Sequence, residues 1–278
     1  MNLDDPYFQL TPEMQQCCFI ELNPHFKTLI AELTDLQAFV SELSSLLGNK
    51  NLRFTYHHKL LFPEIIITSV ASTFVSIIQC CKYGNLPDAY TLLRKAKDDM
   101  FFYLYLIVVT SRGMGAFSSV PDKHDENIEK WLNNNLSHLH IDDIIKFFTA
   151  PINSNNNTDF NDSEDDTFAN LREGIEKYNI KDTLKRIKDK MNNYTHTNGI
   201  GYCNTLLNRY RDELVDEACK NFLLKAKYIT MAFLFLLILS DGKLVMCDAY
   251  IDALDCNTDP VEGSQYWVAP FVLEFIQK

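Results

Sequence analysis

Two long apolar segments separated by a short polar turn constrain the fold most strongly. The first runs from about Pro63 to Tyr83 and the second from Pro87 to Val109, with Gly84-Asn85 between them. Each segment is apolar around most of its helical circumference, which is typical of helices at the centre of a bundle. A turn of about four residues joins helices that lie antiparallel to each other. The sequence therefore predicts an antiparallel pair of long central helices.

Shorter helices are predicted on both sides of this pair. Capping residues and apolar periodicity favour helices over 23–48, 125–136, 141–148, 168–178, 181–194, 204–239, 245–254 and 268–277. The polar stretch 151–166 is expected to be a flexible acidic loop, because it is rich in Asn, Asp, Ser and Glu. No internal repeat is present, and no strand is assigned. The predicted fold class is all-α, as one domain with a core over about 63–240 on which the N-terminal helix and the helices of 245–278 pack.

The overall charge of the chain limits the surfaces it can offer. The 278 residues carry a formal net charge of −11, and 46% of them are hydrophobic, as in an ordinary globular protein. An acidic surface repels a phosphate backbone, so a broad surface that coats nucleic acid is not expected. A small local basic site in a cleft remains open.

The cysteines and the N-terminus give the expected compartment. The eight cysteines show no CxxC spacing, which fits neither a zinc site nor a disulfide framework. The first residues lack the basic and apolar regions of a signal peptide. The apolar stretches 65–81 and 228–239 are interpreted as buried helices, because a bilayer needs roughly 20 strongly apolar residues. A cytoplasmic protein without a membrane span, metal or cofactor is therefore predicted.

The first candidate for chemistry is an ion pair on the second central helix. Arg94 and Asp98 are four residues apart and share a helical face, which continues through Phe101 and Tyr105. That face is apolar, so the pair is expected to point partly inward, where a charge requires a partner. Either the pair fixes the helix in place, or Arg94 supports an adjacent catalytic or anion-binding site.

The second candidate lies at the end of a predicted helix. Asn192 and His196 are four residues apart, Lys190 precedes them, and Asn198-Gly199 can form a left-handed cap. The helix dipole favours a protonated imidazole there, and a histidine near neutrality can exchange protons in phosphodiester cleavage. His196 is therefore interpreted either as a general acid or base, or as a structural cap.

The other polar clusters give weaker signals. His57-His58 and His138-x-His140 lack the carboxylate partner of a metal motif, and no phosphate-binding loop or nucleophile elbow is present. The aromatic and acidic segment 248–270 is interpreted as a lid on the core or a partner surface.

The order of these motifs resembles the HEPN superfamily over roughly 65–239. The resemblance rests on Leu92-Leu93-Arg94 with Asp98 four residues on, and on Tyr194-Thr195-His196-Thr197-Asn198-Gly199. It implies a helical bundle that forms homodimers, and a metal-independent endoribonuclease active in toxin–antitoxin, abortive-infection or phage-defence systems. It also implies an arginine four to six residues before the catalytic histidine, and here Lys190 stands six residues before His196. A lysine can neutralise a phosphate but lacks the bidentate fork of arginine.

The leading hypothesis is a HEPN-like bacterial stress or phage-defence protein that cleaves RNA. His196 would exchange protons, Lys190 or Arg94 would stabilise the phosphate, and Asn192 would orient it. An antitoxin or another protein partner would accompany it. The alternative is a non-catalytic helical scaffold or sensor, in which Arg94 and His196 are structural.

Overall fold

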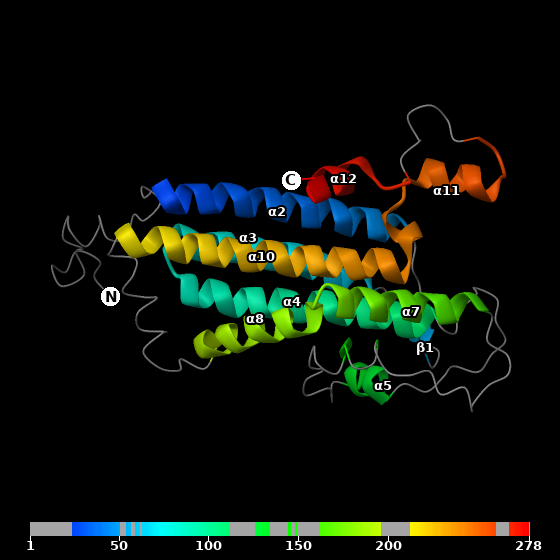
Figure 1. Ribbon diagram of the computed structural model, residues 1–278, viewed down its shortest axis with the longest axis horizontal. Helices are drawn as coiled ribbons and strands as arrows, with labels where there is room; N and C mark the ends of the chain where they lie inside the picture. The colour runs from blue at the N-terminus through cyan, green and yellow to red at the C-terminus, as the bar shows by residue number, and fades with distance from the viewer. Residues whose placement is uncertain are drawn as a thin grey trace, which may run out of the picture.

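The computed structural model describes residues 24–50, 54–56, 59–61, 63–111, 126–133, 144–145, 148, 162–195, 212–259 and 267–277. Within these ranges the chain is almost entirely helical, so the predicted all-α class is confirmed. Four long helices, α2, α3, α4 and α10, run side by side, and shorter helices cover them (Figure 1).

Helices α3 (Glu64–Lys82) and α4 (Leu86–Ser111) pack against each other along their length. Gly84 lies in the left-handed region at φ 65°, where a side chain would be strained. The amide of Gly84 donates to the carbonyl of Cys81 and that of Asn85 to Cys80, at 2.9 and 2.8 Å. These two bonds are the Schellman pattern, which ends α3 and turns the chain directly into α4.

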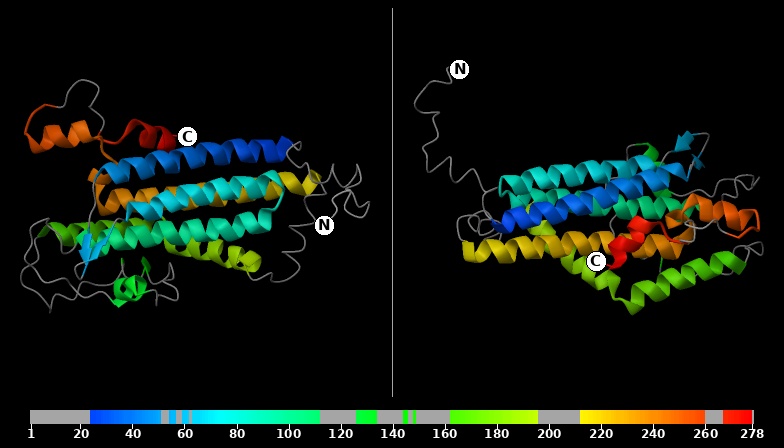
Figure 2. Two further views of the ribbon diagram at one scale, coloured as in Figure 1. Left: turned by 180° about the vertical axis from the view of Figure 1, so that it is seen from behind. Right: turned by 90° about the horizontal axis from the view of Figure 1, so that it is seen from above.

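Helices α2 (Pro24–Asn49) and α10 (Asp212–Ser240) complete the long-helix bundle. An apolar stripe on α2 packs against α3 and α10; its buried members include Leu29, Leu33, Leu36, Val40, Leu43 and Leu47. Helix α10 contacts α2 on one side and α4, α7 and α8 on the others (Figure 2). Its position at the centre explains why its C-terminal half is apolar in almost every residue.

Helices α7 (Asp162–Lys177) and α8 (Ile180–Thr195) pack against α10 and α4 respectively. A bend at Asn179, with φ 48°, separates them. Gly174 lets α7 approach α10 closely, because a Cβ at this position would lie 2.5 Å from the Cδ1 atom of Leu239.

The flexible acidic loop predicted over 151–166 is wrong at its C-terminal end, since residues 162–166 belong to α7. Negative residues in a first helical turn interact favourably with the helix dipole, so this acidic composition also suits a helix start. Residues 151–161 lie outside the described ranges.

The remaining elements are short. Strands β1 (Phe54–Tyr56) and β2 (Lys59–Leu61) form an antiparallel ribbon that the sequence analysis did not assign. The short helices are α5 (Glu126–Leu132), the 3-10 helix η4 (Gly242–Val245), α11 (Asp248–Asp255) and α12 (Pro270–Gln277). Of the predicted helix 141–148, the described residues Ile144, Ile145 and Phe148 are helical and buried. The pairs His57-His58 and His138-x-His140 lie outside the described residues.

Two helices are long and apolar enough to cross a membrane by length and composition. These are Glu64–Lys82 and Leu214–Ser240, of whose apolar windows 33% and 50% are buried inside the bundle. Both apolar stretches belong to longer helices, so the prediction that they are too short for a membrane span is wrong by length and composition. Core helices of water-soluble proteins meet the same criterion, so two such helices are weak evidence for a membrane location.

Candidate functional site

A hollow of about 290 Å³ lies where the start of α4, the end of α8 and the first half of α10 meet. We name it the α4–α8–α10 pocket. Its lining comprises Tyr90 from α4, Lys190 and Tyr194 from α8, and Leu214, Glu217, Ala218, Asn221 and Lys225 from α10. The last described residue of α8, Thr195, follows directly after Tyr194. The pocket thus adjoins the point where the chain leaves α8.

An aromatic stack forms one wall of this pocket. The rings of Tyr90 and Tyr194 are parallel within 6° and their centroids are 4.3 Å apart. Phe222 of α10 meets Tyr90 edge-on at 4.8 Å, so the stack is fixed from the α10 side. Burial and the neighbouring Tyr194 raise the pKa of the Tyr90 phenol, which therefore stays protonated at neutral pH. The wall is therefore aromatic and uncharged.

Two lysines bring positive charge to the pocket. Burial is the main cause that lowers the pKa of Lys225, and the charge of Lys190 lowers it further. The Lys225 ammonium lies 5.4 Å from the centroid of the Tyr90 ring and donates to the Asn221 carbonyl at 2.9 Å. No carboxylate among the described residues forms an ion pair with Lys225. The two ammonium groups repel each other beside the aromatic wall, and a bound anion would reduce this repulsion.

A second polar cluster continues along α4. Its centre is Lys97, whose side chain is 1% exposed and whose ammonium lies 2.8 Å from the Asp98 carboxylate. Burial lowers the pKa of Lys97, with smaller contributions in the same direction from Lys188 and Arg94, while Asp98 opposes the shift. The predicted pair of Arg94 and Asp98 is present at 3.8 Å. One carboxylate therefore balances two cations, and we name Arg94, Lys97 and Asp98 the Lys97 cluster.

The Lys97 cluster and the pocket lie on the same α4–α8 seam. Tyr90 stacks on Tyr194, and Lys97 lies near Lys188, so the two helices run antiparallel with Arg94 between these two levels. Two polar atoms of this seam are buried without a hydrogen-bond partner, Nη1 of Arg94 and Oδ1 of Asn192. A buried polar atom without a partner costs free energy unless a ligand or water satisfies it.

The structure brings together some of the predicted site residues. Lys190 lines the pocket, and Asn192 follows it on α8, half-buried. Arg94 and Asp98 lie one and two turns beyond Tyr90 on α4, and neither of them lines the pocket. His196, the predicted general acid or base, lies outside the described residues.

Two functional candidates were missed by sequence reasoning. Lys225 and Lys97 each occupy a position on an apolar stripe, after Phe222 and Leu93 at spacings of three and four residues. A lysine on a core stripe was the available signal.

Within the aromatic and acidic segment 248–270, helix α11 lies at one end of the bundle (Figure 1). Lys50 forms an ion pair with Asp248 and donates to the Met246 carbonyl at 2.8 Å. The Ala269 amide donates to the Val245 carbonyl at 2.7 Å, which holds the start of α12 beside η4. Residues 260–266 lie outside the described ranges.

Metal chemistry finds no support in the parts of the chain that the structure describes. They contain no group of three or more histidine, cysteine or acidic side chains arranged to hold an ion. Comparisons with known protein families, curated proteins and solved structures found no match.

Proposed function

We propose that the protein is a HEPN-like endoribonuclease that binds an RNA phosphate in the α4–α8–α10 pocket and cleaves the chain without a metal. The observation that carries the proposal is that Lys190 and Lys225 both line the pocket, beside the stacked rings of Tyr90 and Tyr194. The sequence motif that suggested phosphodiester chemistry thus contributes two residues, Lys190 and Tyr194, to a pocket in which Lys225 supplies a second cation.

Single-stranded RNA suits this combination of groups. Its phosphates are attracted to lysine ammonium groups, and its bases stack on aromatic rings. The pocket is small and local, so it is compatible with a net charge of −11 over the whole chain. Transient binding of one or two nucleotides is the expected mode.

In the proposed mechanism, His196 exchanges a proton at the ribose 2′-hydroxyl or at the leaving oxygen. In the chain it follows Tyr194, a residue of the aromatic wall, by two positions. Lys190 and Lys225 would stabilise the negative charge that develops on the phosphate, and Asn192 would orient it. Arg94 would act through the Lys97 cluster, as a residue that positions the α4–α8 seam.

The setting that we propose follows from the same resemblance. The protein would act in the bacterial cytoplasm in stress or phage defence, as a homodimer controlled by an antitoxin or another partner protein. Growth inhibition on expression, relieved by a neighbouring gene product, would be the cellular sign of this activity.

The decisive experiment compares the parent protein with His196→Ala on a labelled single-stranded RNA in the presence of a chelator. Loss of a general acid or base lowers the cleavage rate by about 10²–10⁴-fold. His25→Ala is the matched control, because Nδ1 of His25 on α2 lies 3.1 Å from the Asp216 carboxylate and His25 does not line the pocket. If His196→Ala still cleaves RNA and still inhibits growth as the parent does, the mechanism is wrong.

A helical scaffold or sensor without catalysis is the second candidate function. It is favoured by the contacts of Arg94, which faces Asp98 in the Lys97 cluster and does not line the pocket. On this alternative, RNA is not cleaved under any ionic condition, and replacing Arg94 lowers only the stability of the fold.

A further inference from the structure

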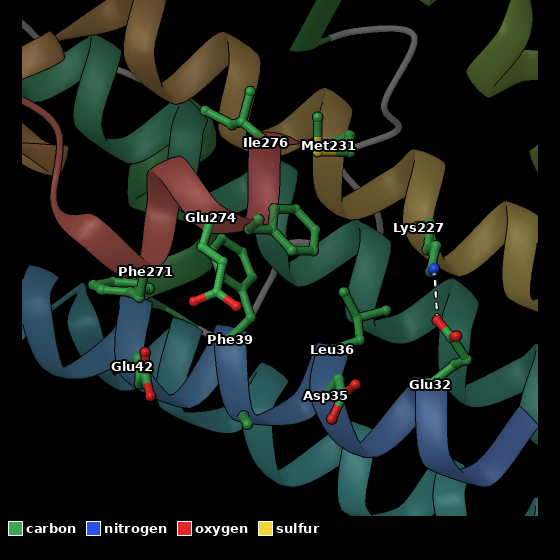
Figure 3. Close-up of a pocket in the computed structure, with 12 residues that line it drawn as sticks. Glu32, Asp35, Leu36, Phe39, Glu42, Lys227, Met231, Phe271, Glu274 and Ile276 are labelled. Atoms are coloured by element: carbon green, nitrogen blue, oxygen red, sulfur yellow. Dashed lines mark hydrogen bonds and ion pairs between the residues drawn. The ribbon is translucent and has the colours of Figure 1, made fainter. Parts of the chain in front are cut away.

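A second hollow lies on the side of α10 that faces α2. It measures about 320 Å³ and is formed by α2, α10 and the C-terminal helix α12 (Figure 3). We name it the α2–α12 groove. Its apolar lining includes Leu36 and Phe39 from α2, Met231 from α10, and Phe271, Phe275 and Ile276 from α12.

The rim of this groove is strongly acidic. Four carboxylates line it, those of Glu32, Asp35, Glu42 and Glu274, against the single ammonium of Lys227. Lys227 is already paired with Glu32 at 2.7 Å. Within the described part of the chain, no ion pair involves Asp35 or Glu42, and both residues are accessible from the groove. The groove therefore offers an apolar floor beside two carboxylates that have no cation of their own.

The shape of the groove suits a helix better than a compact small molecule. Its α2 residues run from Glu32 to Glu42, which corresponds to about 15 Å of helix axis, or nearly three turns. Along the chain, Leu36 and Phe39 lie between Asp35 and Glu42, and all four residues line the groove (Figure 3).

Helix α12 shows which kind of segment this face already holds. It is an eight-residue helix that places Phe275 in a parallel stack on Phe39, with centroids 3.8 Å apart. Phe271, one turn earlier, lies 5.8 Å from the same ring. Phenylalanines at i and i+4 of a short helix thus anchor on α2, and the groove continues past them towards Leu36 and Lys227.

From this geometry we infer that the α2–α12 groove binds a cationic amphipathic helix of a partner protein. Apolar side chains of the partner, spaced at i, i+3 or i+4 and i+7, would fill the floor between Phe39 and Met231. Lysine or arginine side chains at the flanks would pair with Asp35 and Glu42. Opposite charge along the rim would select basic helices and reject acidic ones with the same apolar pattern.

The test measures binding of synthetic helices to the full chain. The probe is a labelled peptide of roughly 15 residues, about four turns, with Leu and Phe at the apolar spacing and Lys on both flanks. The second probe keeps the apolar residues and replaces every Lys by Glu. We expect saturable micromolar binding of the first probe, at least tenfold weaker binding of the second, and weakening of the first as salt is raised.

The double variant Asp35→Lys with Glu42→Lys tests whether the peptide binds at the groove. It should weaken the cationic probe at least tenfold and leave RNA cleavage unchanged, because neither residue lines the α4–α8–α10 pocket. The matched control is Glu173→Lys with Glu176→Lys, two acidic residues on α7 that do not line the groove and whose replacement changes the net charge equally. The control should bind the cationic probe as the parent does.

Several outcomes would overturn the inference. Equal binding of the two probes, equal loss in both variants, or no binding of the cationic probe would each exclude an acidic helix-binding groove. Saturable binding of spermidine that the groove variant removes, without peptide binding, would identify a site for small organic cations. Self-association in sedimentation that the groove variant alone abolishes would identify a second copy of the chain as the occupant.

Discussion

Helix α10 contributes a lysine to each of two hollows, and the two lysines have opposite surroundings. Lys225 lies in the α4–α8–α10 pocket next to Lys190 and over the Tyr90 ring, with a lowered pKa. Lys227, only two residues later, lies in the α2–α12 groove and is paired with Glu32. The pocket carries two lysines and one glutamate, whereas the groove carries four carboxylates and one lysine.

The comparison shows how one helix can serve two surfaces of opposite charge. Residues two apart on a helix point to nearly opposite sides, so neighbouring positions can face different partners. The net charge of −11 does not reveal the difference between the pocket and the groove, because it is summed over the whole chain. An acidic chain can therefore present a cationic pocket on one side of a helix and an acidic groove on the other.

The largest expected effect is a loss of RNA cleavage when a lysine of the pocket is replaced, whereas replacing Lys227 of the groove should have little effect. Lys225→Ala should lower RNA cleavage by about 10²–10³-fold, since it removes a cation aimed at the developing charge. Lys190→Ala should act in the same direction, and Lys190→Arg should retain cleavage because the charge remains. Rates on a labelled single-stranded RNA under chelating conditions provide the measurement.

Lys227→Ala is the matched control for this prediction, because it removes the same charge from the same helix on the groove side. Its cleavage rate should stay within about twofold of the parent, which is less than about 0.5 kcal/mol in the barrier. Equal losses in Lys225→Ala and Lys227→Ala would show that only the overall charge matters and that the pocket has no special role.

Much of the fold was predictable because local rules and packing agree. Pro63 and Gly84 bound α3 in the sequence and in the structure, and the apolar periodicity that predicts a helix over 23–48 matches the buried face of α2. The β1–β2 ribbon was missed because each strand has three residues, too few for an alternating pattern to be recognised. The early start of α7 was missed because polarity alone does not distinguish a loop from a charged first turn.

The candidate site was less predictable than the fold. The Arg94–Asp98 pair follows from helical spacing, which is a local property. The meeting of Lys190 with Lys225 depends on the packing of α8 against α4 and α10, between residues far apart in the chain. No local pattern encodes that meeting, and a single sequence gives no information on which distant residues touch.

The second expected effect concerns the stability of the seam beside the pocket. Asp98→Asn should lower the free energy of unfolding by about 2 kcal/mol, because it leaves the buried Lys97 ammonium without its counter-charge. This value is below the range for fully buried pairs, since the Asp98 side chain is 43% exposed. Lys97→Met should change stability by less than about 1 kcal/mol, because an apolar side chain of similar length suits a buried position.

Urea unfolding of both variants and of the double variant measures this difference. The double variant has neither the ammonium nor the carboxylate, so no charge of this pair is left buried and most of the loss should be recovered. A loss in Lys97→Met as large as in Asp98→Asn would mean that the Lys97 ammonium itself stabilises the fold, which would contradict the assignment of its burial as unfavourable.

A smaller effect is expected on the groove side. Phe275→Ala removes the ring that stacks on Phe39 and should lower the stability of α12 by about 1 kcal/mol, the range for one aromatic pair. The loss should be local, so amide hydrogen exchange should rise in α12 and remain unchanged in α8. Faster exchange throughout α2 and α10 would show instead that α12 is an integral part of the bundle.

A dependence on pH distinguishes the seam from the pocket. Burial lowers the pKa of Lys97 in the folded state, so between that pKa and the unfolded value of 10.5 the unfolded chain binds more protons. The stability of the parent therefore rises with pH through this residue, by at most about 1.4 kcal/mol per pH unit for one proton. Lys97→Met lacks this contribution, so its stability relative to the parent should be highest near pH 7 and should decrease towards pH 10.

Lys225→Met should show the same direction with a smaller slope, because Lys225 is only half-buried. Urea unfolding midpoints of Lys97→Met, Lys225→Met and the parent across this pH range give the slopes. Parallel curves for Lys97→Met and the parent would mean that Lys97 titrates alike in the folded and unfolded states. Its burial would then carry no electrostatic cost, and the seam would differ from the pocket in packing alone.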